Sequence, residues 1–287
     1  MSFAARRLQR RLTSTDYKRV VAERFLNPDQ KVNIFKEHPN WAASVIPMGG
    51  GQLVEMYADQ PIQGQLLYFH GGALRVPLNE EQLDFIDSLA QASHSKPFIA
   101  DYPLLNEETD GAQIIQFAEE ALEWLGEDGK TTTIVADSAG AWLAFYLLLT
   151  HDNLINSAIL VSPWLNWNLS DQPVVERAAA DVMLDIPTLR QIGKQFWMGL
   201  TDAQRQTFTQ ETLSVTSPVQ ILYGNDEMLV PDSEELADDL SENNPNVTIT
   251  RFKDGFHDFI LWPDLPETKK AINAMAEFLK DQRGVSN

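Results

Sequence analysis

The sequence predicts an α/β protein with a mostly parallel central sheet flanked by helices, and three observations lead to this fold class. From residue 52 onward, short apolar runs alternate with longer amphipathic ones, as in chains built from successive βα units. Most of the short runs are continuously aliphatic or β-branched, which indicates strands buried on both faces. The chain has 287 residues, of which 44% are hydrophobic and 22% charged, and this suits one globular domain with a large core. We therefore expect a single domain over residues 1–287.

The individual elements follow from the same alternation. Strands are expected at residues 52–57, 65–69, 97–101, 132–136, 158–161, 219–223 and 247–252. Helical periodicity lies between them, at residues 80–92, 110–125, 139–150, 233–240 and 267–279.

Two regions depart from this alternation. Residues 1–45 are expected to be helical, and residues 164–215 form a long insertion between two expected strands. Because the insertion is too long for a structureless connection, we expect helices in it, one of them at 187–198, covering part of the molecule. Aromatic and Met side chains commonly line ligand pockets, although here they could equally form the core of the insertion. The candidates for such a pocket are Trp164, Trp167, Phe196, Trp197 and Met198.

Composition excludes several classes of function. Cysteine is absent, so there is no disulfide, thiolate metal site or thiol nucleophile. The five histidines are scattered and no HExxH motif occurs, so no metal site is expected. The glycine run at residues 49–51 precedes a strand rather than a helix, so it is not a phosphate loop and no cofactor is expected.

Charge and hydropathy set the expected partners and compartment. The formal net charge of −19 opposes binding to nucleic acid or anionic membranes, although residues 1–40 carry nine basic and four acidic residues. This basic segment is either a solvated helical arm or one that lies on the acidic body of the protein. No apolar run approaches the ~18 residues of a membrane span, and no apolar segment follows the N-terminal arginines. We expect a cytoplasmic protein that acts on a small molecule, and the sequence leaves a homodimer open.

The segment Ala-Asp-Ser-Ala-Gly at residues 136–140 is the most informative stretch, because it lies between an expected buried strand and an apolar helix. A serine at such a turn is held in a strained conformation, which needs small residues two positions to either side. Ala136 and Gly140 meet this requirement around Ser138. The amide of Ala139, at the start of the helix, would point toward an anion forming beside Ser138. The alternative is an ordinary tight turn.

A second loop could supply further amides. The segment His70-Gly-Gly-Ala directly follows an expected strand, and glycines let backbone N–H groups approach a substrate oxygen closely. Gly72 and Ala73 are therefore candidate oxyanion donors. An ordinary Gly-Gly turn is the alternative.

A serine nucleophile needs a base, and the base needs an acid to orient it. His257 is the best base among the five histidines, because it follows the last expected strand on a loop with a glycine. Asp226 is the predicted acid, because it lies just beyond the end of a buried strand. Glu227 and Asp232 remain rivals, although Asp232 is better explained as the cap of the next helix.

With these motifs in this order, the chain resembles an α/β-hydrolase of the hormone-sensitive-lipase-like esterase group over residues 65–279, about three quarters of its length. His70-Gly-Gly-Ala resembles the HGGG loop of that group, Asp101-Tyr-Pro-Leu its DYRLAP segment, and the segment around Ser138 its GDSAG elbow. Gly224-Asn-Asp-Glu and His257-Asp-Phe complete the match. The departures are Ala73 in place of the third loop glycine and Ala136 in place of the first elbow glycine, which put efficiency and substrate range in question.

The resemblance implies hydrolysis of carboxylic esters, here expected to have short acyl chains, through an acyl-serine intermediate. It implies an oxyanion hole made by the amides of Gly72, Ala73 and Ala139, and a cap made by residues 1–45 and 164–215. Asp137 is expected to orient its neighbours rather than act as a nucleophile, because Ser138 occupies the apex of the elbow. The rival functions are a non-catalytic binding protein on the same fold and an amidase or peptidase with the same triad.

Overall fold

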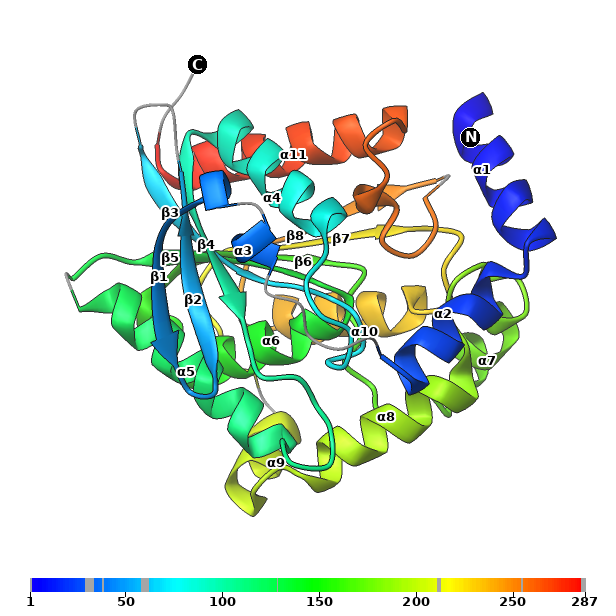
Figure 1. The fold of residues 1–287 in the computed structure, drawn as a ribbon, viewed down its shortest axis with the longest axis horizontal. Helices are drawn as coiled ribbons and strands as arrows, with labels where there is room; N and C mark the ends of the chain where they lie inside the picture. The colour runs from blue at the N-terminus through cyan, green and yellow to red at the C-terminus, as the bar shows by residue number, and fades with distance from the viewer. Residues whose placement is uncertain are drawn as a thin grey trace.

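The computed structural model describes residues 2–28, 34–37, 39–57, 62–127, 129–210, 213–253 and 255–284. Its centre is an eight-stranded sheet in the order β1-β2-β4-β3-β5-β6-β7-β8, with helices on both faces (Figure 1). β1 and β2 form a hairpin, β2 runs antiparallel to β4, and the other neighbours are parallel. The predicted fold class, an α/β protein with a mostly parallel central sheet flanked by helices, is confirmed.

The strands are β1 (Ala42–Met48), β2 (Gly51–Met56), β3 (Gly64–Phe69), β4 (Ser95–Asp101), β5 (Thr132–Asp137), β6 (Ile155–Val161), β7 (Val219–Gly224) and β8 (Val247–Phe252). All seven expected strands are present. β1 is an eighth strand that was not expected, and its residues 42–45 fall in the segment that was wrongly expected to be helical. It is an edge strand whose residues alternate between half-buried and exposed, so it lacks the apolar run that marks the inner strands.

The two faces of the sheet are covered by different helices. One face packs against α4 (Glu80–Ser93) and α11 (Pro266–Gln282), and the other against α5 (Gly111–Gly126), α6 (Ala141–Thr150) and α10 (Val230–Ser241). Neighbouring residues of one strand divide between the two cores, as Leu66 and Leu67 of β3 do. This follows from the alternation of side chains along a strand and explains the continuous apolar runs.

The remaining helices come from the two regions that broke the alternation. They are α1 (Phe3–Ser14), α2 (Tyr17–Leu26) and α3 (Ile34–Glu37) near the N-terminus, and α7 (Gln172–Ala178), α8 (Ile186–Met198) and α9 (Asp202–Phe208) in the insertion. Residues 1, 29–33, 38 and 211–212 of these regions lie outside the described residues. The two regions meet, since Lys18 Nζ donates to the carbonyl of Ala178 at 2.5 Å and α2 contacts α8. Short 3-10 turns complete the fold: η1 (Pro39–Trp41), η2 (Ser138–Gly140), η3 (Asp152–Leu154) and η4 (Phe259–Leu261).

Among the described helices, none combines the length and the apolar character that crossing a bilayer requires.

Candidate active site

Ser138 lies at the sharp turn between β5 and α6. Its φ of 47° lies in the left-handed region, which is strained for a residue with a side chain. Gly140 makes the turn feasible, because a Cβ at that position would lie 2.1 Å from the carbonyl oxygen of Phe69 in β3. The expected strained serine turn is therefore present, and the short strand-to-helix connection presents the hydroxyl at the carboxyl end of β5.

His257 lies next to this serine, as predicted. It follows β8 in the chain, and its Nε2 is 2.9 Å from Ser138 Oγ. Both side chains are nearly inaccessible, with residue exposures of 2% for His257 and 6% for Ser138. The fold thus brings together two residues 119 positions apart in a buried hydrogen bond.

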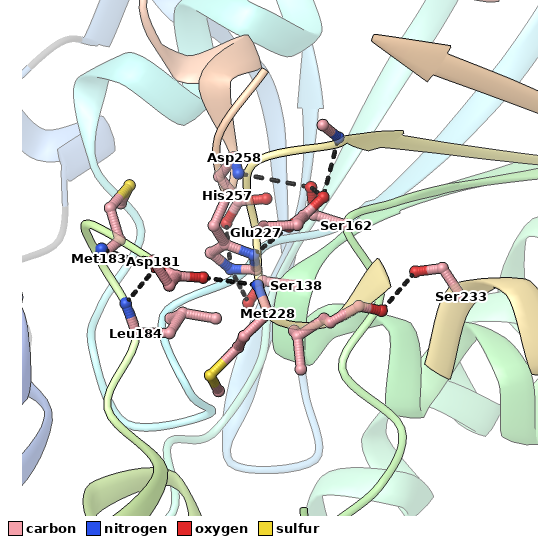
Figure 2. A network of polar contacts seen from close by, with 12 residues as sticks. Ser138, Ser162, Asp181, Met183, Leu184, Glu227, Met228, Ser233, His257 and Asp258 are labelled. Carbon is pink, nitrogen blue, oxygen red and sulfur yellow. Dashed lines mark hydrogen bonds and ion pairs between the residues drawn. The ribbon is translucent and has the colours of Figure 1, made fainter. Parts of the chain in front are cut away.

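The carboxylate beside the imidazole is Glu227, which the sequence left open as a rival, and not the predicted Asp226. Glu227 Oε2 lies 2.7 Å from His257 Nδ1 (Figure 2). Its other oxygen, Oε1, accepts from the Ser162 hydroxyl at 3.0 Å and from the Gly224 amide at 2.9 Å. Every oxygen of this buried carboxylate is thus held by a donor, which fixes the side chain against the ring.

Asp226 faces the opposite way. Its Oδ2 accepts from Gln9 Nε2 of α1 at 3.0 Å, and its amide donates to the Gly255 carbonyl. Adjacent residues of the turn after β7 direct their side chains to different sides, and the sequence placed a carboxylate at this strand end without showing which of the two points inward. Ser162, which steadies Glu227, was also missed, although its place directly after β6 is the kind of signal that marks site residues in such sheets.

Asp232, the other rival acid, lies in the first turn of α10 and does not cap it, because the helix begins at Val230. Burial raises the pKa of Asp232 to about 7, and repulsion from Asp171 and Glu235 adds to this.

The loop that follows β3 passes directly beside Ser138. A Cβ on Gly71 would lie 3.1 Å from Ser138 Cβ and 2.4 Å from Asp137 Oδ2, so only glycine fits there. Gly72 and Ala73 both have positive φ, 104° and 54°. The loop is fixed by a 2.7 Å hydrogen bond from the Tyr102 hydroxyl to the His70 carbonyl. The three predicted oxyanion donors, Gly72, Ala73 and Ala139, therefore belong to the two backbone segments that adjoin Ser138.

The predicted pocket residues take three different places. Trp164 is buried, and its backbone amide donates to the Ser138 carbonyl at 3.1 Å. Trp167 and Trp197 stack on each other with centroids 6.2 Å apart, and Trp197 also packs against Trp142 of α6. Met198 is 67% exposed, which does not fit an enclosed pocket. Trp197 thus packs both within the insertion and against the body of the protein, so the aromatic side chains do not form a core of the insertion alone.

The model of the alpha/beta hydrolase fold family matches residues 66–261, which include the serine turn, the glycine loop and the histidine. This chain belongs to the alpha/beta hydrolase fold family.

The fold of this alpha/beta hydrolase is similar to those of several solved structures described as esterases or lipases. An esterase from the bacterial hormone-sensitive lipase family is 20% identical, with a TM-score of 0.76 over 94% of this chain and 99% of that one. An esterase/lipase from an uncultured bacterium is 22% identical, with a TM-score of 0.75 over 95% and 98% of the two chains. A hormone-sensitive lipase from a metagenome library is 17% identical, with a TM-score of 0.74 over 94% and 98%. No curated protein sequence matches the chain.

Two further carboxylates of this alpha/beta hydrolase are buried near the histidine. Asp137, which precedes Ser138 in the chain, accepts from the Tyr68 hydroxyl at 2.5 Å, and burial raises the pKa of Asp137 to about 6. Asp181, from the insertion, accepts from the amides of Met183 and Leu184 and from that of Met228, each at 2.8 Å (Figure 2). Asp181 thereby ties the insertion to the residue that follows Glu227, a contact with no local signal in the sequence. In the part of the chain that the structure describes, no group of three or more His, Cys, Asp or Glu side chains is arranged to hold a metal ion.

Replacing Asp181 with Ala is expected to lower both stability and turnover of this alpha/beta hydrolase. It leaves three backbone N–H groups without their acceptor, which costs about 2–3 kcal/mol in free energy of unfolding, and it frees the loop that holds Glu227. Urea unfolding and kcat for an ester substrate measure the two effects. Asp185→Ala is the matched control in the same insertion, because it removes the cap of α8 at a cost of about 1 kcal/mol. Equal kcat in the two variants would contradict the proposed link to Glu227.

Proposed function

We propose that this alpha/beta hydrolase is a serine carboxylesterase whose triad is Ser138, His257 and Glu227. The observation that carries the proposal is the continuous hydrogen-bonded path from Ser138 Oγ through the imidazole to the Glu227 carboxylate. A strained serine turn, a base within hydrogen-bond distance and an acid that orients the base are the groups that acyl transfer needs.

In this mechanism, His257 Nε2 takes the Ser138 proton as Oγ attacks the ester carbonyl. Glu227 accepts the Nδ1 proton, fixes the tautomer and stabilises the imidazolium that forms. The imidazolium then protonates the leaving alcohol, and water repeats the sequence on the acyl-serine. This proposal differs from the sequence expectation in its acid, Glu227 instead of Asp226.

The oxyanion of the tetrahedral intermediate is assigned to the amides of Gly72, Ala73 and Ala139. The position of Gly71 against Ser138 supports this assignment, because it puts the loop within reach of the ester carbonyl that Ser138 would attack. One such donor typically supplies about 2.7–4 kcal/mol of transition-state stabilisation. Ala73 replaces a glycine of the related motif but already adopts the positive φ of this loop.

The substrate class is assigned to small esters with short acyl chains. The low exposure of Ser138 supports this, as does the coverage of the site by α1, α2 and the insertion, which we propose act as its cap. The printed descriptions of the similar structures name esterases and lipases, which favours esters over amides.

Hydrolysis of p-nitrophenyl acetate and butyrate tests the function directly. The wild-type chain should hydrolyse both, and a fluorophosphonate should add covalently to Ser138, detected by mass spectrometry of the peptide. Ser138→Ala should abolish both reactions, whereas Ser170→Ala, at an exposed serine, should leave them unchanged. Absence of turnover and labelling in the wild type would favour the non-catalytic binding protein. Faster cleavage of aminoacyl p-nitroanilides than of the esters would favour an amidase.

A further inference from the structure

A second carboxylate faces the base from the side of the nucleophile. Asp258 Oδ2 lies 3.3 Å from His257 Nε2, the same nitrogen that Ser138 Oγ approaches at 2.9 Å. The imidazole therefore has Glu227 on Nδ1 and both Ser138 and Asp258 on Nε2 (Figure 2). The mechanism proposed above gives Asp258 no part.

The backbone holds Asp258 in this place. Its φ of 50° and ψ of 35° are left-handed, and its amide donates to Ser162 Oγ at 3.4 Å, the hydroxyl that also supports Glu227. The residue is 6% exposed, and its Oδ1 has no hydrogen-bond partner within the described ranges. A buried carboxyl in a strained conformation with one oxygen against the base is costly unless a proton or positive charge offsets it.

The contact requires a proton. A neutral imidazole that donates from Nδ1 to Glu227 presents a lone pair at Nε2, and that lone pair accepts the Ser138 hydroxyl. An ionised Asp258 beside the same lone pair would be repelled, because both atoms are acceptors. The substrate-free site therefore accommodates one proton more than the triad that is ready to react, carried on Nε2 or on the Asp258 carboxyl.

The surrounding charges favour the binding of an additional proton by His257 and Asp258. The ionisable groups that face the pair are Glu227 after β7, Asp137 at the end of β5, Asp181 in the insertion and Tyr68 in β3, and none of them is basic. Burial opposes a charged imidazole, but Asp258 and Glu227 outweigh it and raise the pKa of His257 to about 9. Burial raises the pKa of Asp258 well above its usual range, although the imidazolium counteracts this.

We propose that Asp258 is a positioning residue that shares an additional proton with His257, and that the free enzyme must lose this proton before Ser138 can be activated. The proposal rests on the triad proposed above. Its consequence is that the acid limb of kcat/KM against pH belongs to the coupled pair and lies above the ordinary histidine value of about 6.5.

The test is Asp258→Asn, which removes the charge and keeps the shape, and Asn tolerates left-handed backbone better than most residues. The acid limb should move to lower pH by about one unit or more, so that the fraction of plateau activity retained at pH 6 rises about tenfold. Asp264→Asn is the matched control, since it makes the same charge change at an exposed residue of the following loop and should leave the limb unmoved. An unmoved limb with a lower plateau in Asp258→Asn would make Asp258 a purely structural residue and overturn the proposal.

Nuclear magnetic resonance gives a readout that needs no turnover. The His257 ring signals, assigned by their loss in His257→Gln, should titrate well above pH 6.5 in the wild type and lower in Asp258→Asn. If no ester is hydrolysed but the signals shift in this way, the proposed carboxylesterase function is refuted and the proposed shared proton is supported. If esters are hydrolysed and the ring titrates alike in both proteins, the shared proton is refuted and the triad stands.

Discussion

Glu227→Gln is expected to lower kcat for p-nitrophenyl butyrate by about 10⁴-fold, the typical effect of removing the negative charge from a triad acid while keeping its shape. Glutamine at this position could no longer stabilise the imidazolium, and its amide would favour the wrong tautomer of the ring. The buried contact of 2.7 Å between Glu227 and His257 makes this the largest catalytic effect of any carboxylate substitution in the site.

Asp226→Asn is the matched control, because it makes the same change at the neighbouring residue. The asparagine can still accept from Gln9, so kcat should stay within a few-fold of the wild type. A large loss in Asp226→Asn together with a small loss in Glu227→Gln would return the role of the acid to Asp226. Such a result would mean that the turn after β7 is arranged differently during catalysis.

Gly140→Ala is expected to have the largest effect on stability, about 3 kcal/mol or more in free energy of unfolding, at the upper end of overpacking costs. The new methyl group would lie 2.1 Å from the Phe69 carbonyl oxygen and 2.9 Å from that of His70. Both contacts are to backbone, so β3 and the glycine loop would have to move away from the elbow. Urea unfolding followed by far-ultraviolet circular dichroism measures the loss, and an insoluble product would agree with it.

Gly126→Ala provides the comparison for this prediction. Its Cβ would meet only the Leu154 side chain at 3.5 Å, an ordinary contact, at the last residue of α5. Alanine has the higher helix propensity, so the free energy of unfolding should change by less than about 1 kcal/mol. Comparable losses in the two variants would show that the contact with β3 does not determine the need for glycine at 140.

Much of the sheet could be predicted from the sequence because its inner strands are buried on both faces. Such strands consist of apolar residues throughout, and seven of the eight could be recognised in this way. β1 could not, since its side chains alternate between half-buried and exposed positions at the sheet edge. The antiparallel direction of β2 relative to β4 was also beyond the pattern, because strand direction depends on the path of the connections.

The juxtaposition of Ser138 and His257 was predictable for a local reason. Small residues around Ser138 and a glycine near His257 mark turns that follow strands, and the carboxyl ends of parallel strands share one edge of the sheet. The carboxylate that contacts His257 was not predictable, because Asp226 and Glu227 are adjacent and only the three-dimensional path of their turn decides which one meets the imidazole. Asp181 contacts Met228 from 47 residues away, which no local pattern records, whereas Ser162 contacts Glu227 from 65 residues away and has only its place after β6 as a signal.

The contact between Gln9 and Asp226 joins residues 217 positions apart. During synthesis on the ribosome, α1 is made early but cannot find this partner until most of the chain has emerged, and His257 follows later still. α1 therefore lacks this partner until the strands of the sheet up to β7 have been synthesised. Ser2, at the start of α1, donates to Glu267 of α11, so the N-terminal helix can complete its packing only after nearly the whole chain has been made.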